Sequence, residues 1–155
     1  MVGVPVLLGD EISVQRVIVQ VPGTALRMKA APCKTAFDES AAVRGILLRF
    51  TASVLHLSAQ TAACNRAHSM KQRCARWLLM SSARIQSNVV PMTHEFLSSM
   101  LGVRRTGVTA IAGELQRSGL IRYHRGQVTI VDRAGLEAAA CECYRIDRAR
   151  FEQRL

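Results

Sequence analysis

The sequence contains no continuous apolar run that approaches the ~18 to 20 residues needed to span a membrane. Its most apolar early stretch, MVGVPVLLGD, is short and is preceded by no basic segment, so it lacks the pattern of a signal peptide. We therefore expect no membrane partner, and a cytoplasmic location is the default expectation.

Motifs of the common catalytic sites are also absent. There is no Ser/His/acid set, no HExxH sequence and no glycine-rich loop of the kind that holds phosphates. The histidines are scattered without ligand spacing, at His56, His68, His94 and His124. We expect the protein not to be an enzyme, and we predict neither a cofactor nor a metal.

The cysteines do not form a regular pattern. They are five in number and irregularly spaced, at Cys33, Cys64, Cys74, Cys141 and Cys143. Reduced thiols are expected for an odd set in a chain without a secretion signal. If Cys141 and Cys143 lay on one helix, their side chains would point about 200° apart. Buried small side chains are therefore the preferred interpretation of CEC, with a metal site or redox pair as the alternative.

Acidic residues are scarce in the middle of the chain. Residues 69–131 carry nine Lys/Arg and two Asp/Glu, so they account for +7 of the net charge of +10. Residues 1–68 carry +3, and residues 132–155 carry no net charge. This local excess favours a negatively charged partner such as nucleic acid. A generally basic, solvated surface is the alternative, because charge by itself says nothing about fold.

Residues 1–37 contain β-branched runs broken by turn residues. VGVPVLL ends at Gly9-Asp10, SVQRVIVQV ends at Pro22-Gly23, and ALRMKA follows. These runs predict two or three strands. So few strands cannot bury both of their faces, so we interpret them as the last strands of a larger β-structure, most of which the chain does not contain.

Residues 38–68 have the pattern of one long helix. Apolar or small side chains recur at alternating spacings of four and three, as in a coiled coil, at Val43, Leu47, Phe50, Val54, Leu57, Thr61 and Cys64. About 40 Å of such a seam, at ~1.5 Å per residue, needs a partner surface. A parallel homodimer is the favoured interpretation, and a helix packed on its own domain is the alternative.

Residues 69–155 predict a helix-turn-helix followed by a hairpin. Ser69 and Gln72 form a capping box for one helix, and Thr93 caps a second that ends at Gly102. A third helix runs from about residue 105 to 117, and a hairpin with its turn at Arg125-Gly126 forms a wing. Asp132 begins a final helix. The expected fold class is mainly α with small β.

The third helix and the wing carry the residues best suited to DNA. A helix fits the major groove, where the fork of an arginine can donate two hydrogen bonds to guanine, and small residues allow a close approach. We expect the start of the helix to face bases, and the second helix and the wing to contact phosphates. The predicted DNA-binding residues are Thr93, His94, Arg104, Arg105, Thr106, Thr109, Ala110, His124, Arg125 and Gly126.

Two segments of the sequence resemble a known family. THEFLSSMLGVRRTGVTAIAGELQRSGLIRYHRGQVTIVDRAGLEAAACECY, residues 93–144, resembles the winged helix-turn-helix domain of Crp/Fnr-type bacterial transcription regulators. AQTAACNRAHSMKQRCARWLLM, residues 59–80, is similar to the linker between dimer helix and DNA-binding domain in one branch of that family. The resemblance implies a homodimer formed by the long helix. It also implies double-stranded DNA and RNA polymerase as partners.

The N-terminal part departs from the family pattern. Residues 2–30 resemble only the last strands of the family's sensor barrel. Where the cyclic-nucleotide-binding barrel has a Gly-Glu pair and an Arg-Ser pair, this chain has Gly3-Val4 and Gln15-Arg16, and Val4 cannot accept a hydrogen bond from a ribose hydroxyl. Cys33 alone does not supply the cysteine cluster of the oxygen-sensing form. We expect no cyclic nucleotide and no oxygen-sensing cluster.

Two functions remain open from the sequence. The first is a sequence-specific transcription regulator that binds a two-fold DNA site as a homodimer. The second is an interaction module without a sensor, which pairs through residues 40–68 with full-length relatives and antagonises them.

Overall fold

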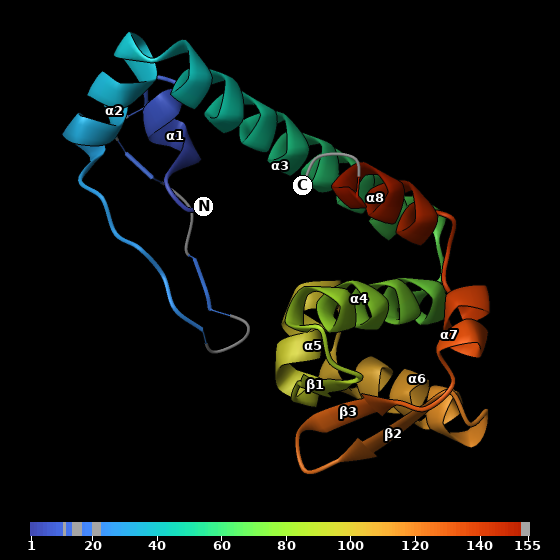
Figure 1. Ribbon diagram of the computed structural model, residues 1–155. Coiled ribbons are helices and arrows are strands. Elements are labelled where there is room, and N and C mark those ends of the chain that lie inside the picture. The colour runs from blue at the N-terminus through green and yellow to red at the C-terminus, as the bar shows by residue number, and fades with distance from the viewer. Residues whose placement is uncertain (11, 14–16, 20–22, 153–155) are drawn as a thin grey trace. The chain divides into compact units, whose positions relative to one another are not determined.

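The structure is a computed structural model that describes residues 1–10, 12–13, 17–19 and 23–152. Two compact units, Met1–Ala59 and Gln60–Leu155, divide the chain, and helix α3 runs from the first unit into the second (Figure 1). The described residues are mainly helical with one small antiparallel sheet, which confirms the predicted fold class. No helix among the described residues is long and apolar enough to cross a membrane.

The elements are α1 (Val4–Leu7), α2 (Ala30–Glu39), α3 (Ala41–Ala67), α4 (Met70–Ile85), β1 (Val89–Pro91), α5 (His94–Leu101), α6 (Arg105–Arg117), β2 (Ile121–His124), β3 (Gln127–Ile130), α7 (Arg133–Ala139) and α8 (Cys143–Glu152).

The strands predicted within residues 1–37 are absent from the described residues of that segment. Val4–Leu7 form a single helical turn, α1, which packs against α2. Part of the second predicted strand, including Gln15 and Arg16, lies outside the described residues. A strand needs a neighbouring strand for its backbone hydrogen bonds, and the sheet of the described residues lies elsewhere, within residues 89–130. The prediction of a strand across Val4–Leu7 was therefore wrong.

The long helix begins three residues later than the sequence pattern predicted. Asp38 and Glu39 belong to α2, and Ser40 separates the two helices with an extended backbone. The hydroxyl oxygen of Ser40 accepts a hydrogen bond from the backbone N–H of Val43, at 3.3 Å, so Ser40 caps α3. From Ala41 the helix continues without interruption to Ala67.

The side chains of the predicted seam on α3 become occupied by contacts within the chain towards the C-terminal end of the helix. Ile46 and Leu55, beside the seam, are 59% and 62% exposed. By contrast, Thr61 accepts a hydrogen bond from Arg76, and Cys64 is fully buried against other cysteines of the same unit. Cys64 is therefore occupied within its own chain and is not available to a partner helix, contrary to the prediction.

The second unit builds a winged helix-turn-helix. Ser69 and Gln72 form the predicted capping box at the start of α4, and α4 packs against α5, α6, α7 and α8. The sheet has the strand order β1-β3-β2, with Val90 opposite Val128 and Tyr123 opposite Val128 on its other side. Strand β1 has only three residues, which are too few to show an alternating pattern in the sequence.

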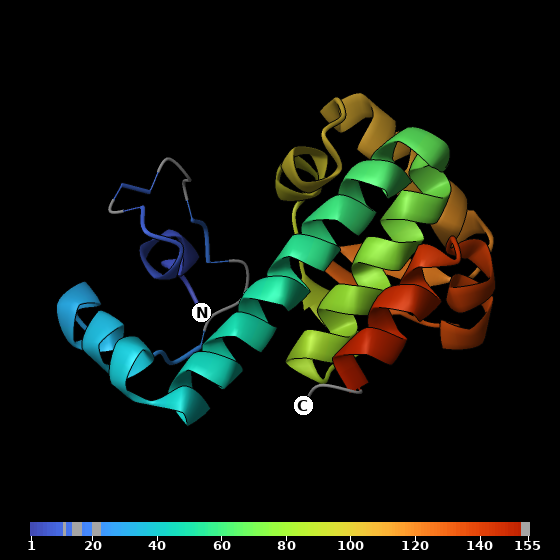
Figure 2. The same ribbon diagram turned by 90° about the horizontal axis from the view of Figure 1, so that it is seen from above.

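One apolar core holds these elements together. Side chains from α4, α5, α6, α7 and the three strands share it, among them Leu78, Leu79, Val90, Leu97, Val108, Leu115, Val128 and Leu136. Helix α8 lies beside α4 (Figure 1 and Figure 2), where Arg76 Nη2 and Asp147 Oδ2 form a buried ion pair at 2.6 Å. The interior of this unit therefore fixes α6 and the wing from behind and leaves their outer surfaces exposed.

Candidate nucleic-acid interface

Helix α6 separates its buried and exposed residues cleanly. Val108, Ala112 and Leu115 face the core, at the three- and four-residue spacing of one helix face. The predicted DNA-binding residues of this helix, Arg104, Arg105, Thr106, Thr109 and Ala110, are all exposed. The structure therefore brings these five residues together on one outer surface, at the N-terminal half of the helix.

The first turn of α6 is positive for two reasons. Arg104, at the N-cap, makes no side-chain cap, and the first turn contains no acidic residue. The backbone N–H groups of a helix start, which lack partners within the helix, carry a partial positive charge. The guanidinium groups of Arg104 and Arg105 add to it. Among the described residues, no ion pair forms with either arginine.

A tight turn positions α6 against α5. Gly102 adopts a left-handed conformation, with φ of 63°, and its N–H closes the end of α5 on the carbonyls of Ser98 and Ser99. The left-handed region strongly favours glycine. Arg73, on α4, donates a hydrogen bond to the carbonyl of Leu101, which places a positive charge at the C-terminal end of α5. These contacts fix the angle at which α6 leaves the turn.

The start of α5 is capped as predicted. The side-chain oxygen of Thr93 accepts a hydrogen bond from the N–H of Phe96, at 3.1 Å. Its methyl group lies close to Gly126 in the wing turn. The carbonyl of Gly126 also accepts a hydrogen bond from the N–H of Met92, at 2.7 Å. The N-terminus of α5 and the tip of the wing are therefore neighbours, so both can reach one stretch of nucleic-acid backbone.

The wing has the turn that its sequence predicted. Arg125 and Gly126 both have positive φ, 45° and 77°, as in the tight turns that suit a two-residue hairpin. His124 and Arg125 are exposed at its tip, and Gly126 is half-buried. The side-chain carbonyl of Gln116, on α6, accepts a hydrogen bond from the N–H of Tyr123, at 2.8 Å. This bond joins the wing to α6, and the sequence pattern gave no signal for it.

The sequence suggested His94 as a DNA-binding residue, but its side chain contacts other residues of the same unit. Its ring lies against Tyr123, with centroids 4.2 Å apart, and its Nδ1 is 3.1 Å from the hydroxyl of Thr109. Because the Thr109 hydroxyl donates to the carbonyl of Arg105, its oxygen is left to accept from His94. Burial and the positive charge of Arg105 lower the pKa of His94 below its usual 6.5. His94 is therefore suited to hold α5, α6 and β2 together as a neutral ring, rather than to contact a phosphate as a cation.

Gly107 also faces inwards. A Cβ atom at this position would lie 3.1 Å from the end of the Met70 side chain. The small residue thus leaves room for α4.

The one acidic side chain of α6 is neutralised by a contact that the sequence did not reveal. Glu114 Oε1 lies 2.6 Å from the ammonium of Lys71, on α4. The pair is half-exposed, so it stabilises little by itself. Its main consequence is electrostatic, because the only carboxylate on the helix is paired with a cation.

Comparisons with known proteins are consistent with this geometry. Residues 72–139 match the family model of the Crp-like helix-turn-helix domain. No curated protein matches the chain. A solved transcriptional regulator of the Crp/Fnr family from Eubacterium rectale is similar at 26% identity over 71% of this chain and 51% of its own, with a TM-score of 0.58. A Crp/Fnr-family regulator from Thermus thermophilus is similar at 28% identity over 56% of this chain and 47% of its own, with a TM-score of 0.51.

A third structure supports the fold alone. FixK2 from Bradyrhizobium japonicum is 18% identical over 74% of this chain and 60% of its own, with a TM-score of 0.68. The chain spans about half the length of the first two relatives. Those two are described as transcriptional regulators, which agrees with the expectation that the chain is not an enzyme.

Proposed function

Since residues 72–139 belong to the Crp-like helix-turn-helix domain family, we propose that the chain is a transcription regulator that binds specific DNA sequences with α6 in the major groove. The observation that carries this proposal is the surface at the start of α6. Arg104, Arg105 and Thr106 are exposed there, while the opposite face of the helix is fixed in the core. A cytoplasmic location follows as the place where such a regulator meets DNA.

The chemistry of this surface fits base recognition. An α-helix enters the major groove of B-DNA, and the first residues of a recognition helix face the base edges. Arg105 can donate two hydrogen bonds to the O6 and N7 atoms of guanine, and the methyl group of Thr106 can contact that of thymine. Because His94 holds the Thr109 hydroxyl from inside, Thr109 offers its remaining surface to the groove.

The flanking elements fit the DNA backbone. His124 and Arg125 are exposed at the wing tip, next to Gly126, which contacts Met92 and the exposed Thr93 at the N-terminus of α5. Phosphate contacts of this kind fix the register of a protein on DNA without reading its sequence. Each phosphate that is neutralised should steepen the salt dependence of binding by ~0.9 in log–log slope.

We further propose that a second copy pairs through α3. The part of the seam that remains available consists of Val43, Leu47, Phe50, Val54 and Leu57, and the neighbouring Ile46, Leu48 and Leu55 are exposed. A parallel pair of helices would present two α6 helices to half-sites about one turn of DNA, ~34 Å, apart. Sedimentation equilibrium of the wild type and of Phe50→Glu tests this, since only the wild type should have the mass of a dimer.

Selection of bound sequences from a random DNA pool, at low and at physiological salt, tests the proposed function. A two-fold symmetric sequence recovered at both salt concentrations supports a dimeric, sequence-specific regulator. Weak binding that shows no preferred sequence and disappears at the higher salt contradicts it, because a basic surface alone gives that behaviour.

A second function is supported by the same exposed side chains on α3. Apolar residues such as Leu55 could equally pair with α3-like helices of full-length family members, so that the chain would act as an antagonist. Mixing the chain with a full-length relative and measuring the mass of the complex distinguishes the two. A stable heterodimer without selective DNA binding favours the antagonist.

A further inference from the structure

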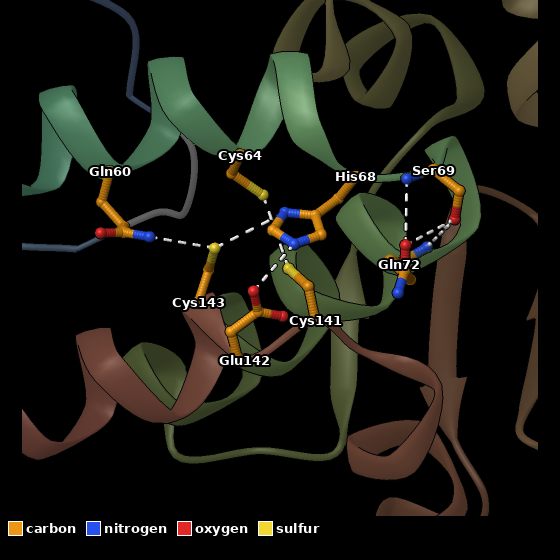
Figure 3. Close-up of polar contacts among 8 residues, drawn as sticks. All are labelled: Gln60, Cys64, His68, Ser69, Gln72, Cys141, Glu142 and Cys143. Carbon is orange, nitrogen blue, oxygen red and sulfur yellow. Dashed lines mark hydrogen bonds and ion pairs between the residues drawn. The ribbon is translucent and has the colours of Figure 1, made fainter.

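A second group of reactive side chains lies within the Gln60–Leu155 unit, away from the residues of α6 and the wing. Cys64, His68, Cys141 and Cys143 converge between the end of α3 and the segment that joins α7 to α8 (Figure 3). One potential ligand atom from each residue lies within 4.8 Å of all the others. The three cysteines are buried, and His68 is half-buried. The DNA-binding proposal uses none of the four.

The backbone explains how the four side chains meet. Cys64 and His68 are one helical turn apart, and the N–H of His68 donates to the carbonyl of Cys64, so both side chains leave α3 on the same face. Helix α7 ends at Ala139, and Ala140 is extended, with ψ of 161°. Cys141 and Cys143 are therefore not on one continuous helix. The expectation that their thiols diverge was wrong, because it assumed such a helix.

Two distances within the group match those of a tetrahedral metal site. With metal–sulfur and metal–nitrogen bonds of about 2.3 and 2.0 Å, two sulfur ligands of zinc lie about 3.8 Å apart, and a sulfur and a nitrogen about 3.5 Å apart. Here the Sγ atoms of Cys64 and Cys141 are 3.5 Å apart, and Cys143 Sγ is 3.7 Å from His68 Nδ1. We propose that Cys64, His68, Cys141 and Cys143 bind one zinc ion in a four-coordinate site.

The surroundings of the four residues are those of a metal site. His68 Nε2 is 3.1 Å from a carboxylate oxygen of Glu142, which favours the tautomer with the proton on Nε2 and leaves the lone pair of Nδ1 towards the thiols (Figure 3). Metal-binding histidines are commonly oriented by a carboxylate in this way. The side-chain amide of Gln60 donates a hydrogen bond to Cys143 Sγ, at 3.0 Å. A metal-bound thiolate accepts hydrogen bonds of this kind. Glu142 and Gln60 therefore contact the four proposed ligands and are not ligands themselves.

The ligand set selects the kind of metal and its role. Three thiolates and one imidazole suit zinc, whereas calcium and magnesium prefer oxygen ligands. Four protein ligands leave no open position for a substrate, so the site is structural rather than catalytic. The ion would join the last turns of α3 to the start of α8. Because it binds the folded state, it would stabilise this corner of the unit.

The test begins with the metal content of the whole chain. The protein is purified under reducing conditions without chelators, and zinc is measured by mass spectrometry. We expect about one zinc per chain in the wild type and in Cys33→Ser, which changes a cysteine outside the group. Cys64→Ser and Cys141→Ser should lose it, whereas His68→Cys should retain it, because four cysteines also form a zinc site. Stoichiometric zinc in Cys64→Ser and Cys141→Ser would overturn the proposal.

A cobalt titration gives an answer that does not depend on whether the variants fold. Cobalt(II) is added to the metal-stripped wild type under reducing conditions. The proposal predicts a thiolate-to-cobalt charge-transfer band and strong visible bands of tetrahedral cobalt, both saturating at about one cobalt per chain. Absence of the charge-transfer band, or a Cys64–Cys141 disulfide that forms instead, would overturn it. Glu142→Gln should keep the spectrum and weaken zinc binding about 10- to 100-fold.

Discussion

Arginine serves two opposite purposes in the Gln60–Leu155 unit. On α4, Arg76 is 3% exposed and forms two hydrogen bonds to Asp147, at 3.0 and 2.6 Å, in the contact between α4 and α8. On α6, Arg104 and Arg105 are exposed, and no acidic side chain among the described residues pairs with them. The first arrangement stabilises the fold, and the second leaves the charge for an external anion.

The difference separates stability from binding within one small unit. A buried ion pair matters because removing one partner leaves a charge without compensation in a region that excludes water. An exposed arginine contributes little to folding, yet it can contribute strongly to DNA binding when its partner is a base or a phosphate. Substitutions at the two positions should therefore affect different measurements.

The largest effect is expected for Arg76→Ala. Asp147 would remain buried without its main partner, so the free energy of unfolding should fall by about 3 to 5 kcal/mol. Urea denaturation measures this, and Arg117→Ala, at an exposed arginine on α6, is the control that should change stability by less than ~0.5 kcal/mol. If Arg76→Ala were as stable as that control, the buried pair would not be what holds α8 to α4.

Arg105→Ala should show the opposite pattern. Its stability should stay within ~0.5 kcal/mol of the wild type, while binding to the selected DNA site should weaken by about 1 to 3 kcal/mol, with a relaxed preference at one base pair. Fluorescence anisotropy with matched and mismatched duplexes measures this. The control is again Arg117→Ala, at the other end of α6. An equal loss on every sequence would identify Arg105 as a phosphate contact only.

Gly135→Ala and Gly113→Ala test how tightly two glycine positions of this unit are packed. A Cβ atom at Gly135 would lie 2.6 Å from Leu120 and would also clash with the Asp132 carboxylate that caps α7. We expect a loss of about 1 to 3 kcal/mol in unfolding free energy. Gly113→Ala, in α6, has ordinary room for the added methyl group and should gain up to ~1 kcal/mol from helix propensity. Thermal unfolding of the two variants should shift in opposite directions.

The smallest expected effect is the contribution of His94 to the pH dependence of stability. The pKa of His94 is lowered from 6.5 by burial and by Arg105, so the folded state favours the neutral ring. This contribution to stability is fully present above 6.5 and is lost as the pH falls from 6.5 through the lower folded pKa. NMR titration should give a pKa below 6.5 for His94. The pH dependence of stability in this range should be weaker in His94→Gln, and an unchanged dependence would contradict the assignment.

The sequence predicted local features well where the signal itself is local. The caps at Ser69, Thr93 and Asp132, the turn at Gly102 and the wing turn at Arg125-Gly126 are all confirmed, since each depends on a few neighbouring residues.

Features that depend on distant residues were missed. Nothing in the sequence showed that His94 would lie on Tyr123, that Lys71 would pair with Glu114, or that Gly107 would face Met70. The cysteines illustrate the same limit, because Cys64 and Cys141 are 77 positions apart and meet only after α7 has ended. The strand pattern near the N-terminus misled because β-branched residues do not form a strand without a neighbouring strand.

Amide chemical-shift mapping of the full chain with a duplex that carries the selected site tests the central claim most directly. The claim predicts that the largest shifts fall on residues 93–94, 104–110 and 124–126, with little change at residues 74–79 in the core face of α4. Shifts of similar size over the whole basic surface, or a maximum outside these three segments, would contradict the placement of α6 in the major groove.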